Sequence, residues 1–166
     1  MKSGIILTLC VCAGLGFLAH AQTKAPVLNA PQKETRVAEH AKGTFEVKTT
    51  LQPAEDQDDP NLGRYSLEKK FHGDLEATSK GQMLTAGTAV KGSAGYVAIE
   101  KVTGTLRGRN GSFVFQHLGT MTQGVPQLSV TVVPDSGTGE LVGISGKMDI
   151  IIADGKHSYD FEYSIP

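Results

Sequence analysis

The stretch that decides the fold is AGYVAIEKVTGTLRGRNGSFVFQHLGTM, residues 94–121. Apolar and polar residues alternate on both sides of the segment RGRNG, with the period of two that is typical of β-strands. Asn110 and Gly111 form the dipeptide that most strongly favours a tight hairpin turn. The stretch therefore predicts two antiparallel strands that are joined at residues 107–111.

The same alternation recurs before and after this hairpin. Candidate strands lie at residues 45–51, 65–71, 75–90, 126–133, 147–152 and 157–165, the third interrupted near Lys80-Gly81. About eight short strands with no convincing helix between them predict an all-β fold, either a sandwich or a closed antiparallel barrel. The 20 glycines favour a single small eight-stranded barrel, because glycine lets strands bend at barrel corners.

The N-terminus has the layout of a secretory signal peptide. Lys2 precedes an apolar run from Ile5 to Leu18, and the small-residue pattern Ala19-His20-Ala21 follows. A membrane anchor is the alternative, but the run is shorter than the roughly 20 residues of a spanning helix. We expect a signal peptide at residues 1–21, a flexible arm at 22–39 and a barrel domain at 40–166, secreted or periplasmic and without a stable membrane anchor.

The composition excludes several classes of function. Both cysteines, Cys10 and Cys12, lie in the expected signal peptide, so thiol catalysis, zinc–thiolate sites and disulfide scaffolds are excluded for the mature chain. The formal net charge is −1 and no basic face interleaved with aromatics occurs, which argues against a nucleic-acid partner. The histidines lack the same-face spacing of a metal site, and we expect neither a metal nor a cofactor.

The glycine-rich segment SGTGELVGISG, residues 136–146, raises the question of a phosphate site. A dinucleotide site needs a helix after the glycines, because the free amides of its first turn hold the phosphates. Here the β-branched run KMDIII follows, and Gly146-Lys147-Met148 is not the Gly-Lys-Ser or Gly-Lys-Thr of a phosphate loop. We therefore expect a structural loop that packs Leu141 and Ile144 under the barrel.

This loop in its context VVPDSGTGELVGISG, together with FHGDLEATS, YVAIEKVTGTLRGRNGSFVFQHLGT and the final strand, resembles the bacterial domain-of-unknown-function family numbered 3224. The resemblance runs from about His40 to Ile165. It implies an eight-stranded barrel of the allene oxide cyclase type, which the plant dirigent proteins share. It implies no activity, because the family has none established and one fold serves many functions.

Candidate site residues come from the faces expected to point into the barrel. Glu100 and His117 lie on adjacent strands, and a buried carboxylate beside an imidazole can transfer protons, so this pair is the catalytic candidate. The alternatives are reversed faces, which leave both groups solvated, and a buried pair that is only structural. The expected ligand-binding residues are Tyr96, Phe113 and Phe115 as aromatic walls, and Lys69 and Glu76 as a second polar cluster or, alternatively, a surface ion pair.

Three functions remain open on these residues. The barrel can bind a small apolar or amphipathic molecule between its aromatic side chains. It can be an isomerase or cyclase in which Glu100 and His117 move a proton while the barrel excludes water. It can also have a filled core and act through its outer surface, for example as a homo-oligomer. We rank ligand binding first because it needs the fewest special residues.

The export prediction has a direct test. Mass analysis of the protein recovered from a periplasmic or culture fraction should give a chain that begins at Gln22, because the signal peptidase cuts after small residues such as Ala21. Recovery of the full-length chain in the membrane fraction would contradict export.

Overall fold

The computed structural model describes residues 37–53 and 59–166, and these residues form nine β-strands. The strands are β1 (Glu39–Leu51), β2 (Leu62–Gly73), β3 (Leu75–Gly87), β4 (Ala94–Leu106), β5 (Arg109–Thr122), β6 (Val125–Val132), β7 (Thr138–Gly139), β8 (Ser145–Ala153) and β9 (Lys156–Ser164). This part of the chain contains no helix of the length and apolarity that a membrane span requires. The expected signal peptide, and residues 22–36 of the expected arm, lie outside the described residues.

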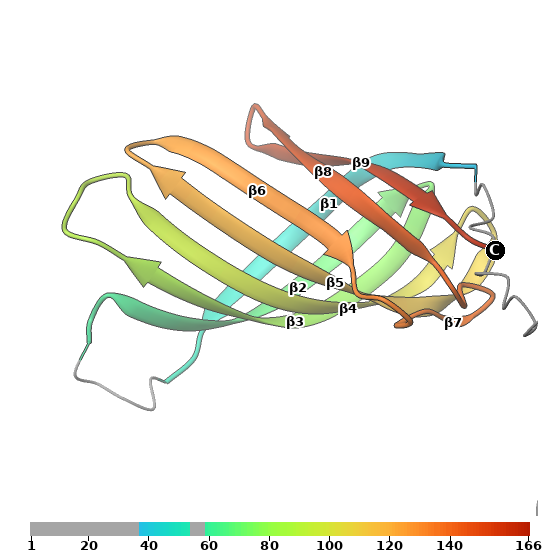
Figure 1. Ribbon diagram of the computed structural model, residues 1–166, viewed down its shortest axis with the longest axis horizontal. Helices are drawn as coiled ribbons and strands as arrows, with labels where there is room; N and C mark the ends of the chain where they lie inside the picture. Colours follow the sequence, from blue (N-terminus) through green and yellow to red (C-terminus); the bar gives the residue numbers. More distant parts are fainter. Residues whose placement is uncertain (1–36, 54–58) are drawn as a thin grey trace, which may run out of the picture. The chain divides into compact units, whose positions relative to one another are not determined.

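One antiparallel sheet closes on itself. Its strand order is β4-β3-β2-β1-β9-β8-β6-β5, and an additional β4–β5 pairing completes the ring. The two-residue β7 lies outside the ring and pairs with β5. The fold is therefore a closed eight-stranded antiparallel barrel with one extra strand (Figure 1), which confirms the all-β barrel that the alternation predicted.

The β4–β5 hairpin turns at Arg107-Gly108, and the prediction of a turn at Asn110-Gly111 is wrong. Arg107 and Gly108 have φ angles of 45° and 84°. Positive φ at both central residues is typical of the type I′ turn, whose twist matches that of the flanking strands. Asn110 and Gly111 instead pair with β4 inside the ladder. Two glycine-containing dipeptides competed for this turn, and the pairing of the long strands selected the first.

β3 also differs from its prediction, because it runs through Lys80-Gly81 without an interruption. Gly81 pairs with Glu100, and a Cβ atom at position 81 would lie 2.4 Å from the backbone oxygen of Ile99. The glycine therefore marks a place where two backbones approach closely, not a break in the strand.

The two ends of the barrel differ. We call one the turn end, where the β2–β3 and β4–β5 turns lie with the glycine-rich loop, and the other the open end, where β1, β3 and β5 finish. Apolar side chains fill the interior at the turn end: the ring of Phe161 stacks on Phe113 with centroids 5.7 Å apart and meets Phe115 edge-on at 5.2 Å. Leu141 and Ile144 of the glycine-rich loop are buried in this core, as the sequence predicted.

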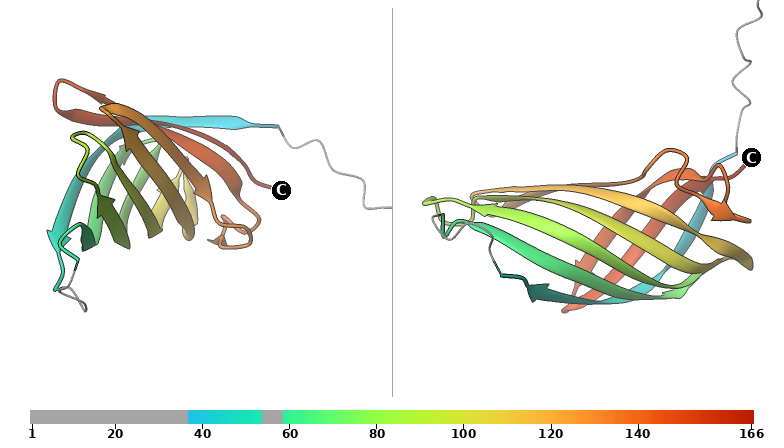
Figure 2. Two further views of the ribbon diagram at one scale, coloured as in Figure 1. Left: turned by 60° about the vertical axis from the view of Figure 1, so that its left-hand side comes forward. Right: turned by 90° about the horizontal axis from the view of Figure 1, so that it is seen from below.

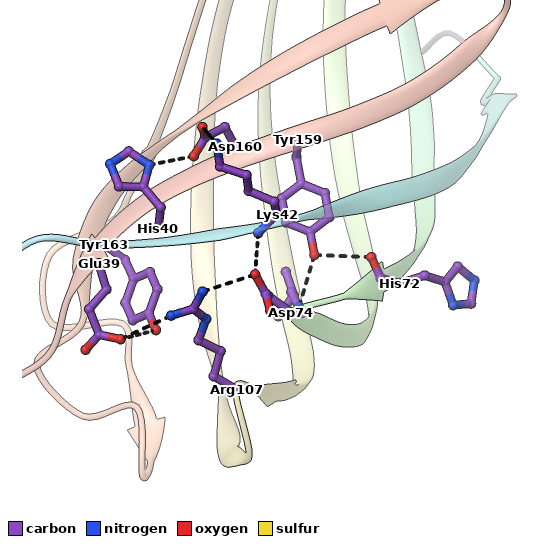
Figure 3. Close-up of polar contacts among 10 residues, drawn as sticks. Glu39, His40, Lys42, His72, Asp74, Arg107, Tyr159, Asp160 and Tyr163 are labelled. Atoms are coloured by element: carbon purple, nitrogen blue, oxygen red, sulfur yellow. Dashed lines mark hydrogen bonds and ion pairs between the residues drawn. The ribbon is translucent and has the colours of Figure 1, made fainter.

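A polar network around Asp74 holds the turn end together (Figure 3). The Asp74 carboxylate accepts hydrogen bonds from the Lys42 backbone amide, at 2.9 Å, and from the Arg107 guanidinium, at 3.3 Å. The backbone amide of Asp74 donates to the Lys42 carbonyl at 3.0 Å, and that of Arg107 donates to the Asp74 carbonyl at 2.8 Å. These contacts tie the start of β1 to two turns that are distant in sequence.

β8 and β9 stop short of the open end. The pairing of β9 with β1 reaches only to Phe45, and one pair, Thr131 with Lys147, joins β6 to β8. The remaining strands continue toward the open end as a curved sheet (Figure 2). Residues on the inner face of this sheet therefore have no β8 or β9 side chains opposite them.

Candidate functional site

Four polar side chains from four neighbouring strands meet inside the barrel. They are Lys69 on β2, Ser79 on β3, Glu100 on β4 and His117 on β5, and we call them the Glu100 cluster. Alternation along each strand and the register between strands place all four on the inner face. Glu100 is fully buried, and His117 and Lys69 are only 3% and 8% exposed.

Glu100 is the centre of the cluster. Its Oε2 atom accepts a hydrogen bond of 2.7 Å from the Lys69 ammonium, and its Oε1 atom accepts one from the Ser79 hydroxyl. The Lys69 Nζ atom also lies 5.0 Å from the ring centroid of Phe45 and 5.7 Å from that of Phe71. The ammonium therefore has a carboxylate on one side and two aromatic rings nearby.

These contacts keep the buried carboxyl group ionised. Burial alone would raise the pKa of Glu100, because it disfavours the charged form. The His117 ring, the Lys69 ammonium and the Ser79 hydroxyl outweigh burial and lower the pKa of Glu100 to about 2. Glu100 is thus a carboxylate at neutral pH and a weak proton acceptor. It is suited to holding a neighbouring cation or imidazole in place.

One ring nitrogen of His117 contacts Glu100 without a directed hydrogen bond. Its Nε2 atom lies 2.9 Å from Glu100 Oε2, which is close enough for electrostatic attraction. The atom nevertheless makes no directed hydrogen bond with any described residue, although it is buried. Buried polar atoms without partners are rare in folded proteins and each calls for a physical explanation. This is the feature of the cluster that most directly points to a missing partner.

The structure brings Glu100 and His117 together, as expected from their strands and faces, and adds Lys69 to them. It does not bring Glu76 there: this side chain lies on the outer face, where it accepts a 2.8 Å hydrogen bond from the Gly73 amide. Phe113 and Phe115 are fully buried in the filled core. Their proposed contact with a ligand stays a prediction.

Tyr96 lies between the Glu100 cluster and the open end. It is half-buried, and it pairs across strands with Gly119, where a Cβ atom would lie 2.1 Å from the tyrosine ring. Glycine at position 119 therefore gives the ring room to lie flat against β5. Burial, and then the Glu100 carboxylate, raise the pKa of Tyr96, so its hydroxyl stays protonated at neutral pH and can donate a hydrogen bond.

Sequence reasoning missed Ser79. Its signal was present, because Leu75, Ala77 and Ser79 alternate on one face of β3. The same alternation puts Glu76 on the other face. No group of three or more acidic, histidine or cysteine residues in the described part of the chain is placed to hold a metal ion.

The comparisons with known proteins concern this whole barrel. Residues 41–163 match the family described as "Protein of unknown function (DUF3224)". A crystal structure of a DUF3224 protein of unknown function from Shewanella oneidensis MR-1 is similar, with 50% identity and a TM-score of 0.73. The similarity covers 78% of this chain and 100% of that one. None of the curated proteins compared matches the chain.

The cluster predicts how stability responds to substitution. Glu100→Gln leaves the Lys69 ammonium buried without its carboxylate, and we expect a loss of about 3 to 5 kcal/mol in the free energy of unfolding at pH 7. The double variant Glu100→Gln/Lys69→Met removes both charges and should recover most of that loss. Because the pKa of Glu100 is lower in the folded chain, its contribution is present above about pH 4.5 and fades as the pH falls toward 2.

Urea unfolding across this pH range measures the effect. The matched control is Glu162→Gln, which removes the exposed Lys147–Glu162 pair of 3.3 Å and should cost less than about 1 kcal/mol. A Glu100→Gln variant as stable as the parent, or a double variant less stable than the single one, would contradict this description of the cluster.

Proposed function

The chain belongs to the DUF3224 family, and because that family's description states no function, we propose one from the site. We infer that the barrel binds a small apolar or amphipathic molecule on the inner face of its open end. The ligand lies on the open-end side of the Glu100 cluster, with β1 to β6 around it.

The observation that carries this proposal is a group of large apolar side chains that face inward and yet are exposed. By the alternation and register of their strands they line the inner face of the open end: Val47 (38% exposed), Leu51 (65%), Met121 (42%) and Leu128 (44%). Single exposed apolar residues are common, but a group on one concave face is typical of a ligand site. Apolar contact with a ligand would remove this surface from water.

The same site also fits the isomerase or cyclase alternative, and it gives Glu100 and His117 a definite role each. An ionised Glu100 beside His117 is the arrangement in which a carboxylate orients an imidazole and the imidazole moves the proton. His117 would then act as the acid or base, and Glu100 would position it. Binding is the broader proposal because both functions require a ligand next to His117.

A neutral fluorescent probe tests binding at the open end. We expect N-phenyl-1-naphthylamine to increase its fluorescence on mixing with the protein, because the inner apolar side chains shield it from water. Leu128→Lys should weaken this binding at least tenfold, because it puts a charged group on the inner face. A fluorescence titration measures both effects.

Leu118→Lys is the matched control. Leu118 is 55% exposed on the outer face of β5, and its register partner Ser129 is the immediate neighbour of Leu128. The control should bind the probe like the parent. The proposal fails if the parent does not bind the probe, or if Leu118→Lys is the variant that loses binding.

A second candidate function rests on an outer apolar patch near the open end. Leu84, Val97 and Leu118 lie directly opposite one another on β3, β4 and β5, with Leu62 and Ile99 beside them, and all five are at least 48% exposed. The adjoining Gln82, Gln116 and Ser129 are uncharged, and the charged Arg64 lies at the edge of the patch as the register partner of Leu84. Because the patch itself is apolar, it can pack against the same patch of another copy, so the partner we propose is a second copy of this chain.

Sedimentation equilibrium at micromolar concentration tests this second candidate. The parent should be a homo-oligomer, and the double variant Val97→Asp/Leu118→Asp should be a folded monomer, because two carboxylates in each patch oppose self-association. A monomeric parent, or an oligomer that the two substitutions leave intact, would rule this function out.

A further inference from the structure

The Glu100 cluster holds N–H groups that no described acceptor receives in a directed hydrogen bond. From these donors, and resting on the ligand-binding function above, we propose the chemical class of the ligand. Its buried end carries an oxygen that accepts hydrogen bonds, as in a carboxylate or a carbonyl group. Lys69 and His117 are the donors that recognise this oxygen.

Both oxygens of the Glu100 carboxylate already accept a hydrogen bond. Glu100 is its carboxylate, and each of its oxygens has a donor: Lys69 on Oε2 and Ser79 on Oε1. Lys69 has three N–H groups, of which one donates to Glu100, and its other described contacts are with the rings of Phe45 and Phe71. Two ammonium hydrogens are therefore free of any described acceptor.

His117 adds a further donor. Two lone pairs would repel each other at the 2.9 Å separation of His117 Nε2 and Glu100 Oε2, so Nε2 carries the hydrogen. This nitrogen makes no directed hydrogen bond to the carboxylate or to another described residue. A buried N–H group in this position gains most from an acceptor that a ligand brings.

The inward positions next to His117 on the side of the open end have small side chains. The next inward positions are Gly119 on β5 and, directly opposite His117, Ala98 on β4. Neither has a long side chain, and the Tyr96 ring lies against Gly119. A ligand whose apolar part lies on the open-end side chains can thus extend its polar end past Tyr96 toward His117.

The same arrangement disfavours a cationic ligand. An ammonium group has donors only, so it cannot accept from the N–H groups of Lys69 and His117, and it would meet the like-charged Lys69 ammonium. An oxygen atom on the ligand can instead accept hydrogen bonds from Lys69 and His117. The cluster therefore selects between ligands that share an apolar body and differ in the group at one end.

A matched pair of probes tests this selection. 2-Naphthoate and 2-naphthylmethylammonium share the naphthalene body, and each competes with N-phenyl-1-naphthylamine in a displacement titration at pH 7. We expect 2-naphthoate to displace the fluorescent probe at a concentration at least tenfold lower than the ammonium compound. Equal displacement by both compounds, or tighter binding of the ammonium compound, would overturn the proposal while the probe's own binding upholds the ligand site.

Variants at His117 test the role of its N–H group. His117→Phe keeps an aromatic ring beside Phe115 and should weaken the binding of 2-naphthoate at least tenfold more than it weakens the binding of N-phenyl-1-naphthylamine. His117→Gln keeps an N–H donor and should retain more of the 2-naphthoate affinity, which a merely structural role would not predict. The control is His72→Phe, at a partly exposed histidine outside the cluster, and should behave like the parent.

The outcomes are separable. If His117→Phe binds 2-naphthoate like the parent, or His117→Gln loses as much affinity as His117→Phe, the donor assignment is wrong. If His117→Phe does not fold, the ¹⁵N NMR signal of His117 Nε2 in the parent decides. It should shift on addition of 2-naphthoate and not on addition of the ammonium compound, and an unchanged signal would overturn the proposal. Failure of N-phenyl-1-naphthylamine to bind the parent would refute the proposed function itself.

Discussion

Closure of one antiparallel sheet is the constraint on which the rest of this structure depends. A closed sheet has a single interior, and every second residue of each strand must face it. At the turn end that interior holds phenylalanines and the loop residues Leu141 and Ile144, so it is a packed core. Toward the open end β8 and β9 finish early and the same inner face continues without β8 or β9 side chains opposite it. One alternating pattern thus gives a stable core at one end and an exposed apolar surface at the other.

The Glu100 cluster lies where these two regions meet, and it is the part of the interior that is hardest to explain by stability alone. Replacing a buried ion pair by apolar residues of similar size is often neutral or stabilising, so such a pair is weak evidence for a structural role. Here the ionised Glu100 uses its oxygens on Lys69 and Ser79, and the buried His117 nitrogen is left without a directed hydrogen bond. An arrangement with unused donors under an exposed apolar surface is better suited to holding a ligand than to holding the barrel together.

Alternation along the strands was enough to predict the barrel class and the inward direction of Glu100 and His117, because each lies on a strand with a clear period of two. It was not enough for the turn, where Arg107-Gly108 and Asn110-Gly111 are both plausible and the strand register selects between them. Lys69 was placed with Glu76 by sequence proximity, whereas the β2–β3 and β3–β4 pairings carry it to Glu100. The position at which β8 and β9 end also depends on the register between strands, and register cannot be predicted from composition or from the alternation of apolar and polar residues.

The proposed ligand lies inside the barrel, between the open end and the Glu100 cluster. Methyl NMR of the protein saturated with 2-naphthoate tests this most directly, because valine and leucine methyl groups lie on both faces of the same strands. We expect the signals of the inward-facing Val47, Leu128 and Val130 to shift, and those of the outward-facing Leu84, Val97 and Leu118 to stay unchanged. Shifts confined to the outward-facing set would contradict it.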